Sequence, residues 1–303
     1  MGREGCDTVG RMWKFLRRAL VVGLRIAAAV YLLLAVGLYF FQEKLIYFPR
    51  QYAQNIEQDL PPGWQALHFT TSQGKQTVFC KLPGQAPRRV WVFFGGNGSV
   101  AWSWIEMLGT FPREDAALLI EYPGYGLCEG NPTPATILEN SEAAADLAAK
   151  AMGLTREQFN AHLAIAAHSL GCAAGLQFTA RHPVGQVVLF APFTSMLDMA
   201  RLRVGWPLCE LCRHRFDNEA RLRELSERNP PPRVVIFHGT KDGTIPVRMG
   251  RKLAAEFPGM IEFHEAAGAD HNSVLLDNLV PLLEIIHGTA FKILPPLATV
   301  QKF

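Results

Sequence analysis

The stretch AIAAHSLGCAAG, residues 164–175, joins a short apolar run to a helical pattern rich in small residues. Ser169 stands at the junction, where small residues on both sides let the backbone turn sharply from a strand into a helix. Such a turn exposes the serine hydroxyl, and its usual pattern is G-x-S-x-G; here Ala167 replaces the first glycine and Gly171 keeps the second. Serine is also a common helix N-cap, so the stretch by itself leaves both a nucleophile and a cap open.

Apolar runs and helical patterns alternate on both sides of this stretch. The runs are short and continuously apolar, which is typical of parallel strands buried on both faces. The runs cover residues 89–94, 116–122, 163–167, 186–191, 233–238 and 260–266. A hairpin over 64–71 and 75–82 is predicted before them. Helices are predicted over 134–153, 172–183, 247–259 and 273–288. This order predicts an α/β fold with a mainly parallel central sheet and helices on both faces. Ligands in such folds bind beyond the carboxyl ends of the strands, so functional residues are expected there.

An acid and a base follow two of the later strands. A serine hydroxyl is a weak nucleophile and needs a base to accept its proton, held in the right tautomer by a carboxylate. Asp242 follows the run 233–238, and His271 follows the last run. The order Ser169, Asp242, His271 is the order expected for this kind of site. Asp217 is the main rival for the acid, and a structural role is the safer interpretation of the other histidines.

A glycine-rich loop, FFGGNGS at residues 93–99, follows the first long apolar run. Acyl transfer needs N–H donors for the oxyanion that develops on the substrate, and glycines let the backbone approach a substrate closely. The expected donors are the backbone amides of Asn97 and Leu170. The supporting glycines are Gly95, Gly96 and Gly98. A simple turn or a phosphate cradle is the alternative, but the lysine of the G-x-x-x-x-G-K-[ST] pattern is missing.

The segment 19–41 is apolar except for Arg25 near its beginning. About 20 apolar helical residues span the hydrocarbon of a bilayer, and Arg25 can extend to the headgroups. Basic residues are concentrated before the segment, which predicts a cytoplasmic N-terminus and a catalytic domain outside the cytoplasm, in a periplasm or lumen. They are Arg3, Arg11, Lys14, Arg17 and Arg18, and only Lys44 and Arg50 soon follow. We favour an uncleaved single-pass anchor over a signal peptide, whose apolar part is shorter, and over a buried helix.

Four parts are therefore expected along the chain. A basic N-terminus covers 1–18, a transmembrane helix 19–41, a polar connector 42–63 and a catalytic domain 64–303, with a small cap over 194–229. The formal net charge of +3 and scattered basic residues give no reason to propose nucleic-acid binding. Cys209 and Cys212 are spaced like a metal or redox pair, but His214 is the only further ligand nearby, so packing or a local disulfide is the preferred interpretation.

With these pieces in place, the chain resembles the α/β-hydrolase superfamily over roughly residues 64 to 290. The likeness is greatest to the membrane-anchored branch with a serine-aminopeptidase-like domain, which includes lipases, lysophospholipases and protein depalmitoylases. Three further stretches carry it, EKLIYFP at 43–49, EYPGYGLCEGNPTP at 121–134 and APFTSMLDMA at 191–200. The resemblance implies Ser169 as nucleophile, Asp242 as acid and His271 as base.

The chain departs from that family's pattern at three positions. Gly95 stands where many relatives have histidine, Ala167 replaces a glycine, and Cys128 stands where serine is common. None of these changes removes a catalytic group, so the resemblance still implies an active enzyme.

The expected function is that of a membrane-anchored serine hydrolase. It would cleave acyl esters or thioesters of lipid-like molecules, with no metal and no organic cofactor, and its partners would be the lipid bilayer and the acyl substrate. An aminopeptidase-like serine hydrolase is one alternative. A catalytically silent, membrane-tethered binding module is another.

Overall fold

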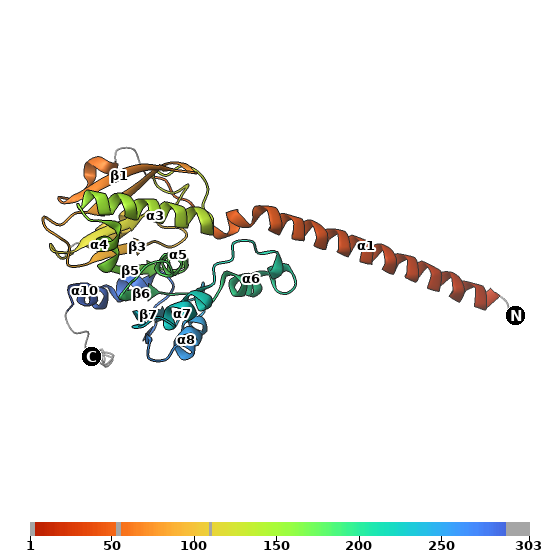
Figure 1. Cartoon of the computed structure of the whole chain (residues 1–303). Coiled ribbons are helices and arrows are strands. Elements are labelled where there is room, and N and C mark those ends of the chain that lie inside the picture. The colour runs from red at the N-terminus through yellow and green to blue at the C-terminus, as the bar shows by residue number, and fades with distance from the viewer. Residues whose placement is uncertain (1–3, 53–55, 109–110, 289–303) are drawn as a thin grey trace, which may run out of the picture.

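The computed structural model describes residues 4–52, 56–108 and 111–288. A long helix, α1 (Glu4–Ile46), extends from an α/β body that holds the rest of the described chain (Figure 1). Arg3 of the predicted basic N-terminus and residues 289–303 of the predicted catalytic domain lie outside the described residues.

Within the described ranges, eight strands form one sheet in the order β1-β2-β4-β3-β5-β6-β7-β8. The strands β1 and β2 form an antiparallel hairpin, β2 is antiparallel to β4, and every other neighbouring pair is parallel. The predicted α/β class with a mainly parallel sheet is confirmed. The strands are β1 Trp64–Thr71, β2 Gly74–Lys81, β3 Val90–Phe94, β4 Ala116–Ile120, β5 Leu163–His168, β6 Gln186–Phe190, β7 Arg233–Gly239 and β8 Ile261–Ala266.

The two faces of the sheet bury separate hydrophobic cores. Side chains of successive strand residues point to opposite faces. Val90, Val92 and Phe94 of β3 pack on one face with the helices α3 (Pro134–Ala151), α5 (Leu170–Thr179), α7 (Asn218–Ser226) and α8 (Val247–Glu256). Trp91 and Phe93 pack on the other face with α2 (Trp102–Met107), α9 (Ser273–Asp277) and α10 (Leu279–His287). This double burial explains why the strand sequences are continuously apolar.

The helices agree in part with the predicted ranges. The predicted helix 273–288 is broken at Asn278, because Pro281 has no N–H to donate to the carbonyl of Asp277 and its ring opposes a continuous helix. Residues 42–46 of the predicted connector are helical. The helices after α1 are α2 Trp102–Met107, α3 Pro134–Ala151, α4 Arg156–Ala161, α5 Leu170–Thr179, α6 Met196–Val204, α7 Asn218–Ser226, α8 Val247–Glu256, α9 Ser273–Asp277 and α10 Leu279–His287, with 3₁₀ turns η1 Ile56–Asp59 and η2 Leu208–Leu211.

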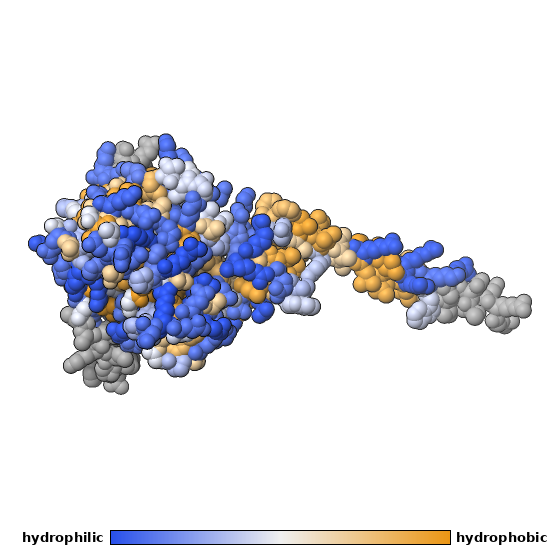
Figure 2. Space-filling model, viewed as in Figure 1, coloured by the Kyte–Doolittle hydropathy of each residue, from blue (hydrophilic) through white to orange (hydrophobic). Residues whose placement is uncertain are grey.

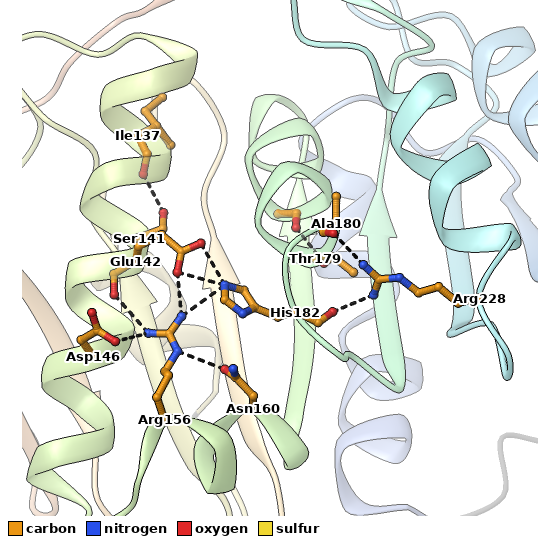
Figure 3. A network of polar contacts seen from close by, with 11 residues as sticks. Ile137, Ser141, Glu142, Asp146, Arg156, Asn160, Thr179, Ala180, His182 and Arg228 are labelled. Atoms are coloured by element: carbon orange, nitrogen blue, oxygen red, sulfur yellow. Dashed lines mark hydrogen bonds and ion pairs between the residues drawn. The ribbon is translucent and has the colours of Figure 1, made fainter.

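A polar network fixes the end of α5 that lies remote from Ser169 (Figure 3). Arg156 of α4 donates to Glu142 at 2.7 Å and to Asp146 at 2.8 Å, both on α3. Glu142 also lies 2.8 Å from Nε2 of His182, just beyond α5, and Arg228 donates to the His182 carbonyl at 2.6 Å. The network joins α3, α4 and the end of α5, so His182 has a structural role, as was expected of the histidines other than His271.

Helix α1 contains a segment, Arg11–Ile46, that is long and apolar enough to cross a membrane, and no residue of its most apolar stretch is buried in the protein. Figure 2 shows apolar residues along this helix, with hydrophilic residues toward its N-terminal end. Large side chains such as Leu33 (71% exposed) and Phe40 (64%) are mostly exposed there. Exposure of this extent is costly in water and favourable in lipid.

Candidate active site

Ser169 lies between the end of β5 and the first residue of α5. Its backbone adopts φ 56° and ψ −120°, a conformation that is unusual for any residue except glycine. The Ser169 amide donates to the Phe190 carbonyl at 2.9 Å, which holds the turn against β6. The side chain makes no capping hydrogen bond to α5, so the geometry disfavours the helix-cap interpretation of this serine.

Gly171 explains why the second glycine of the motif is kept. A Cβ atom at this position would lie 2.3 Å from the carbonyl oxygen of Phe94 and 2.5 Å from that of Gly95. The first turn of α5 therefore passes directly over the end of β3, where only glycine fits. Ala167, which replaces the first glycine, lies inside β5 and is fully buried.

The structure brings the three predicted catalytic side chains into one hydrogen-bonded chain. Nε2 of His271 lies 2.9 Å from Oγ of Ser169. Nδ1 of His271 lies 2.7 Å from Oδ2 of Asp242. An imidazole held between a hydroxyl and a carboxylate in this way can accept the hydroxyl proton while the carboxylate stabilises the resulting cation.

Asp242 is fixed by its own loop. Its Oδ1 accepts hydrogen bonds from the amides of Thr244 and Ile245, at 2.8 and 2.7 Å. Burial raises the pKa of a carboxyl group, but the nearby His238 ring and the hydrogen bonds from His271 and the Ile245 amide outweigh burial and hold the pKa of Asp242 below its ordinary value. The rival Asp217 instead caps α7 by accepting from the amide of Ala220 at 2.9 Å.

Two further histidines support this chain, and sequence reasoning assigned them no specific role. Nε2 of His238, which is fully buried, lies 2.8 Å from the Ile245 carbonyl and 3.6 Å from Oδ2 of Asp242. Nε2 of His168 lies 2.9 Å from the carbonyl oxygen of His271. A carbonyl only accepts, so each ring must donate through Nε2. Their positions beside Ser169 and before the Asp242 loop were the only signals in the sequence.

Asn97 is fixed from two directions in the glycine-rich loop. Its carbonyl accepts from the hydroxyl of Tyr125 at 2.7 Å and from the amide of Phe48 at 3.0 Å. Its side-chain amide donates to the carbonyl of Ile46 at 2.9 Å. Leu170 is the first residue of α5, and an amide at that position has no acceptor within its own helix. Both predicted donors line the same cavity as Ser169.

The three supporting glycines differ in what surrounds them. A Cβ at Gly96 would lie 3.2 Å from the ring of His168, whereas one at Gly98 would meet nothing within 4 Å. A Cβ at Gly95 would lie 2.7 Å from Oγ of Ser99. The carbonyl of Gly95 accepts from the hydroxyl of Tyr122 at 2.6 Å. Tyr122 and Tyr125 thus hold the loop by its carbonyls, a role that the sequence pattern did not reveal.

A cavity of about 540 Å³ opens from Ser169. Apolar side chains of α1, α6 and η2 form most of its wall, while α7 packs against α5 and contributes nothing to it. The part of 194–229 that covers the cavity is therefore 196–212. The residues that line the cavity are Leu38, Gln42, Leu45, Ile46, Phe48, Asn97, Ser169, Leu170, Phe193, Met196, Met199, Ala200, Arg203, Val204, Leu208, Cys209, Leu211, Cys212, Thr244 and Ile245.

Cys209 and Cys212 are free thiols in the wall of this cavity. His214 does not turn toward them as a ligand, because its Nδ1 lies 3.0 Å from the hydroxyl of Tyr47 and its Nε2 lies 3.5 Å from Glu43. Among the described residues, no group of three His, Cys, Asp or Glu side chains is placed to hold a metal ion. Of the two forms of the preferred interpretation, packing or a local disulfide, the structure shows packing, because both cysteines are free.

Comparison with known proteins yields several distant relatives. An uncharacterized protein of Mycobacterium tuberculosis is 24% identical over 263 residues, which cover 84% of this chain and 90% of that protein. Alpha/beta hydrolase domain-containing protein 17B of Homo sapiens is 29% identical over 156 residues, 52% of this chain and 50% of the human protein. No family model matches the chain.

Solved structures share the fold at low sequence identity. An esterase of Pyrococcus furiosus has a TM-score of 0.61 at 13% identity, with 80% of this chain and 97% of the esterase covered. An alpha-beta hydrolase from Vibrio vulnificus has a TM-score of 0.61 at 16% identity, with 80% and 92% covered. The fold of the α/β body is thus one that other proteins also adopt.

Proposed function

This chain belongs to the α/β-hydrolase superfamily, and on that basis we propose that it is a membrane-anchored serine hydrolase that cleaves acyl esters or thioesters of lipid-like molecules. The observation that carries the proposal is the continuous chain from Oγ of Ser169 through His271 to Asp242, at 2.9 and 2.7 Å, at the end of an apolar cavity. A hydroxyl in this setting has both an activating base and a place for an acyl chain.

The chemistry follows from the positions of these atoms. Oγ of Ser169 attacks the acyl carbonyl carbon while Nε2 of His271 takes the hydroxyl proton, and Asp242 stabilises the imidazolium. The amides of Asn97 and Leu170 donate to the oxyanion. His271 then gives the proton to the leaving oxygen or sulfur, and an acyl-enzyme remains. Water, deprotonated by the same imidazole, attacks the acyl-enzyme and releases the carboxylic acid and free Ser169.

The cavity wall favours an acyl substrate over an aminoacyl one. An aminopeptidase must hold a protonated amine, which in a buried site calls for a carboxylate. None of the described residues that line the cavity is Asp or Glu, and most are aliphatic or methionine. A hydrocarbon chain gains free energy in this environment, at about 0.8 kcal/mol for each buried methylene, whereas an ammonium group loses its hydration there.

The membrane topology is part of the proposal. Arg11, Lys14, Arg17 and Arg18 lie on the N-terminal side of the apolar stretch of α1, so the positive-inside rule puts that end in the cytoplasm and the body on the opposite side. Protease protection of intact membrane vesicles tests this orientation. Digestion of the body from the cytoplasmic side would contradict it.

A fluorophosphonate probe tests the catalytic proposal, because it reacts covalently with an activated serine. We expect rapid labelling of the full-length protein and none of Ser169→Ala, while Ser226→Ala, an exposed serine on α7, labels like wild type. Hydrolysis of p-nitrophenyl butyrate should follow the same pattern. Equal labelling of wild type and Ser169→Ala would refute the proposal and favour a silent, membrane-tethered binding module.

A further inference from the structure

The last turns of α1 are joined to the body by specific hydrogen bonds. Gln42 is buried, and its amide nitrogen donates to the carbonyl of Leu211 at 3.2 Å while its oxygen accepts from the amide of Arg213 at 2.6 Å. The hydroxyl of Tyr47 lies 3.0 Å from Nδ1 of His214. Because the contacts come from successive turns, the helix is held in one position against the cap and is more than a flexible tether.

The same turns reach the reaction centre. The carbonyl of Ile46 accepts from the side chain of Asn97, and the amide of Phe48 donates to the Asn97 carbonyl. Asn97 carries one of the proposed oxyanion donors. The end of the anchor therefore helps to fix the loop on which the proposed chemistry depends.

The anchor also forms one wall of the cavity. Leu38, Leu45 and Ile46 line it from α1, opposite cap residues such as Met199 and Val204. Leu38 precedes Ile46 by eight residues, which is about 12 Å along a helix axis. Leu38 lies within the apolar segment 19–41. The cavity thus runs from Ser169 to the level of the hydrocarbon that surrounds the anchor.

The cap carries apolar side chains beside this wall. Trp206 is 77% exposed and Leu202 is 44% exposed. Figure 1 shows α6 and the loop that follows it on the side of the body from which α1 leaves. Tryptophan is enriched where proteins meet the interface of a bilayer, so this side of the cap is suited to contact with the headgroups.

We propose that residues 38–46 of the anchor form the wall of an acyl-chain site, and that the enzyme takes long-chain acyl esters or thioesters directly from the leaflet in which it is anchored. This inference rests on the proposed hydrolase function and adds a substrate class to it. The carbonyl carbon lies at Ser169, and the chain lies along α1 between Leu38 and the cap. A long chain fills the whole cavity, and a short chain leaves its lipid-side end empty.

A substitution at Leu38 tests the site. Leu38→Trp fills the lipid-side end of the cavity, and Leu33→Trp adds the same ring to the same helix at a residue that does not line the cavity. Full-length proteins are reconstituted in phosphatidylcholine vesicles, and kcat/KM is measured with p-nitrophenyl palmitate and butyrate. We expect the palmitate-to-butyrate ratio to fall about tenfold in Leu38→Trp and to stay at the wild-type value in Leu33→Trp.

The outcomes separate the two proposals. Fluorophosphonate labelling of Leu38→Trp shows that Ser169 is still activated, and flotation with the vesicles shows that the protein is membrane-bound, before the ratios are compared. Met199→Trp repeats the test from the opposite wall. An unchanged ratio in both cavity variants would overturn the acyl-chain site and leave the hydrolase proposal standing. Failure of wild type to cleave either ester in a Ser169-dependent way would overturn the hydrolase proposal itself.

Discussion

Replacing His168 by phenylalanine is expected to slow catalysis without weakening substrate binding. Nε2 of His168 donates to the carbonyl of His271 at 2.9 Å, and the two rings lie 5.1 Å apart. Phenylalanine keeps a flat ring at this position but has no N–H, so the His271 carbonyl loses its donor. Burial, together with the nearby His271, lowers the pKa of His168 to about 4, so the ring is a neutral donor at pH 7.

The magnitude follows from the bond that is lost. An unsatisfied buried acceptor costs about 1 to 2 kcal/mol. If that cost falls on the placement of His271 in the transition state, kcat decreases about five- to thirtyfold, because about 1.4 kcal/mol corresponds to a factor of ten. KM for p-nitrophenyl butyrate should not change, since His168 does not line the cavity.

The assay compares kcat, KM and the thermal midpoint of His168→Phe and His168→Gln with those of wild type. Glutamine offers an amide N–H at a similar distance from the backbone, so it should recover most of kcat. A wild-type kcat in His168→Phe would refute the positioning role. An equal loss of kcat and of thermal midpoint in both variants would also refute it, because packing would then explain the effect.

Three further results are expected. Gly171→Ala places a methyl group 2.3 Å from a carbonyl oxygen of β3; it should lower the free energy of unfolding by about 3 kcal/mol, and a wild-type thermal midpoint would contradict this. Asp242 has a lowered pKa and the pKa of His168 is about 4, so neither group changes charge between pH 5 and 8, and the slope of log kcat/KM against pH in that range should not exceed one on the acid side. Burial raises the pKa of Glu121 to about 8, so the folded protein keeps a proton that the unfolded chain releases at lower pH. Stability should therefore fall as the pH rises from the ordinary value of a glutamate to about 8, and Glu121→Gln should remove this fall, as thermal midpoints at pH 5 and pH 8 would show.

Much of the fold follows from local patterns in the sequence. Continuous apolar runs predicted the parallel strands because burial on both faces selects such residues. Ser169, Asp242 and His271 could be singled out because each directly follows a strand, and the carboxyl ends of parallel strands gather at one edge. The break at Asn278 was missed because the apolar period continues across it, and Pro281 lies in the first turn of a new helix, where it is tolerated.

The supporting contacts could not be predicted in the same way. His168 reaches a carbonyl 103 residues away in the sequence, and Tyr125 reaches Asn97 across 28 residues. Such pairings depend on the position that each side chain takes once the whole sheet has assembled. No local pattern in the sequence predicts that position. Docking of Gln42 against the cap is hidden for the same reason, because in sequence it is only a polar residue at the end of an apolar segment.

The contacts of α1 with the body change how removal of this proposed anchor should be interpreted. A truncated body that begins after residue 48 loses the proposed membrane segment, but it also loses the Ile46 and Phe48 hydrogen bonds to Asn97 and one wall of the cavity. Inactivity of such a fragment would therefore not show that the reaction needs a bilayer. The informative comparison keeps α1 through Ile46 and changes its surroundings from lipid to detergent, because the geometry around Asn97 then stays intact and only access to the leaflet is removed.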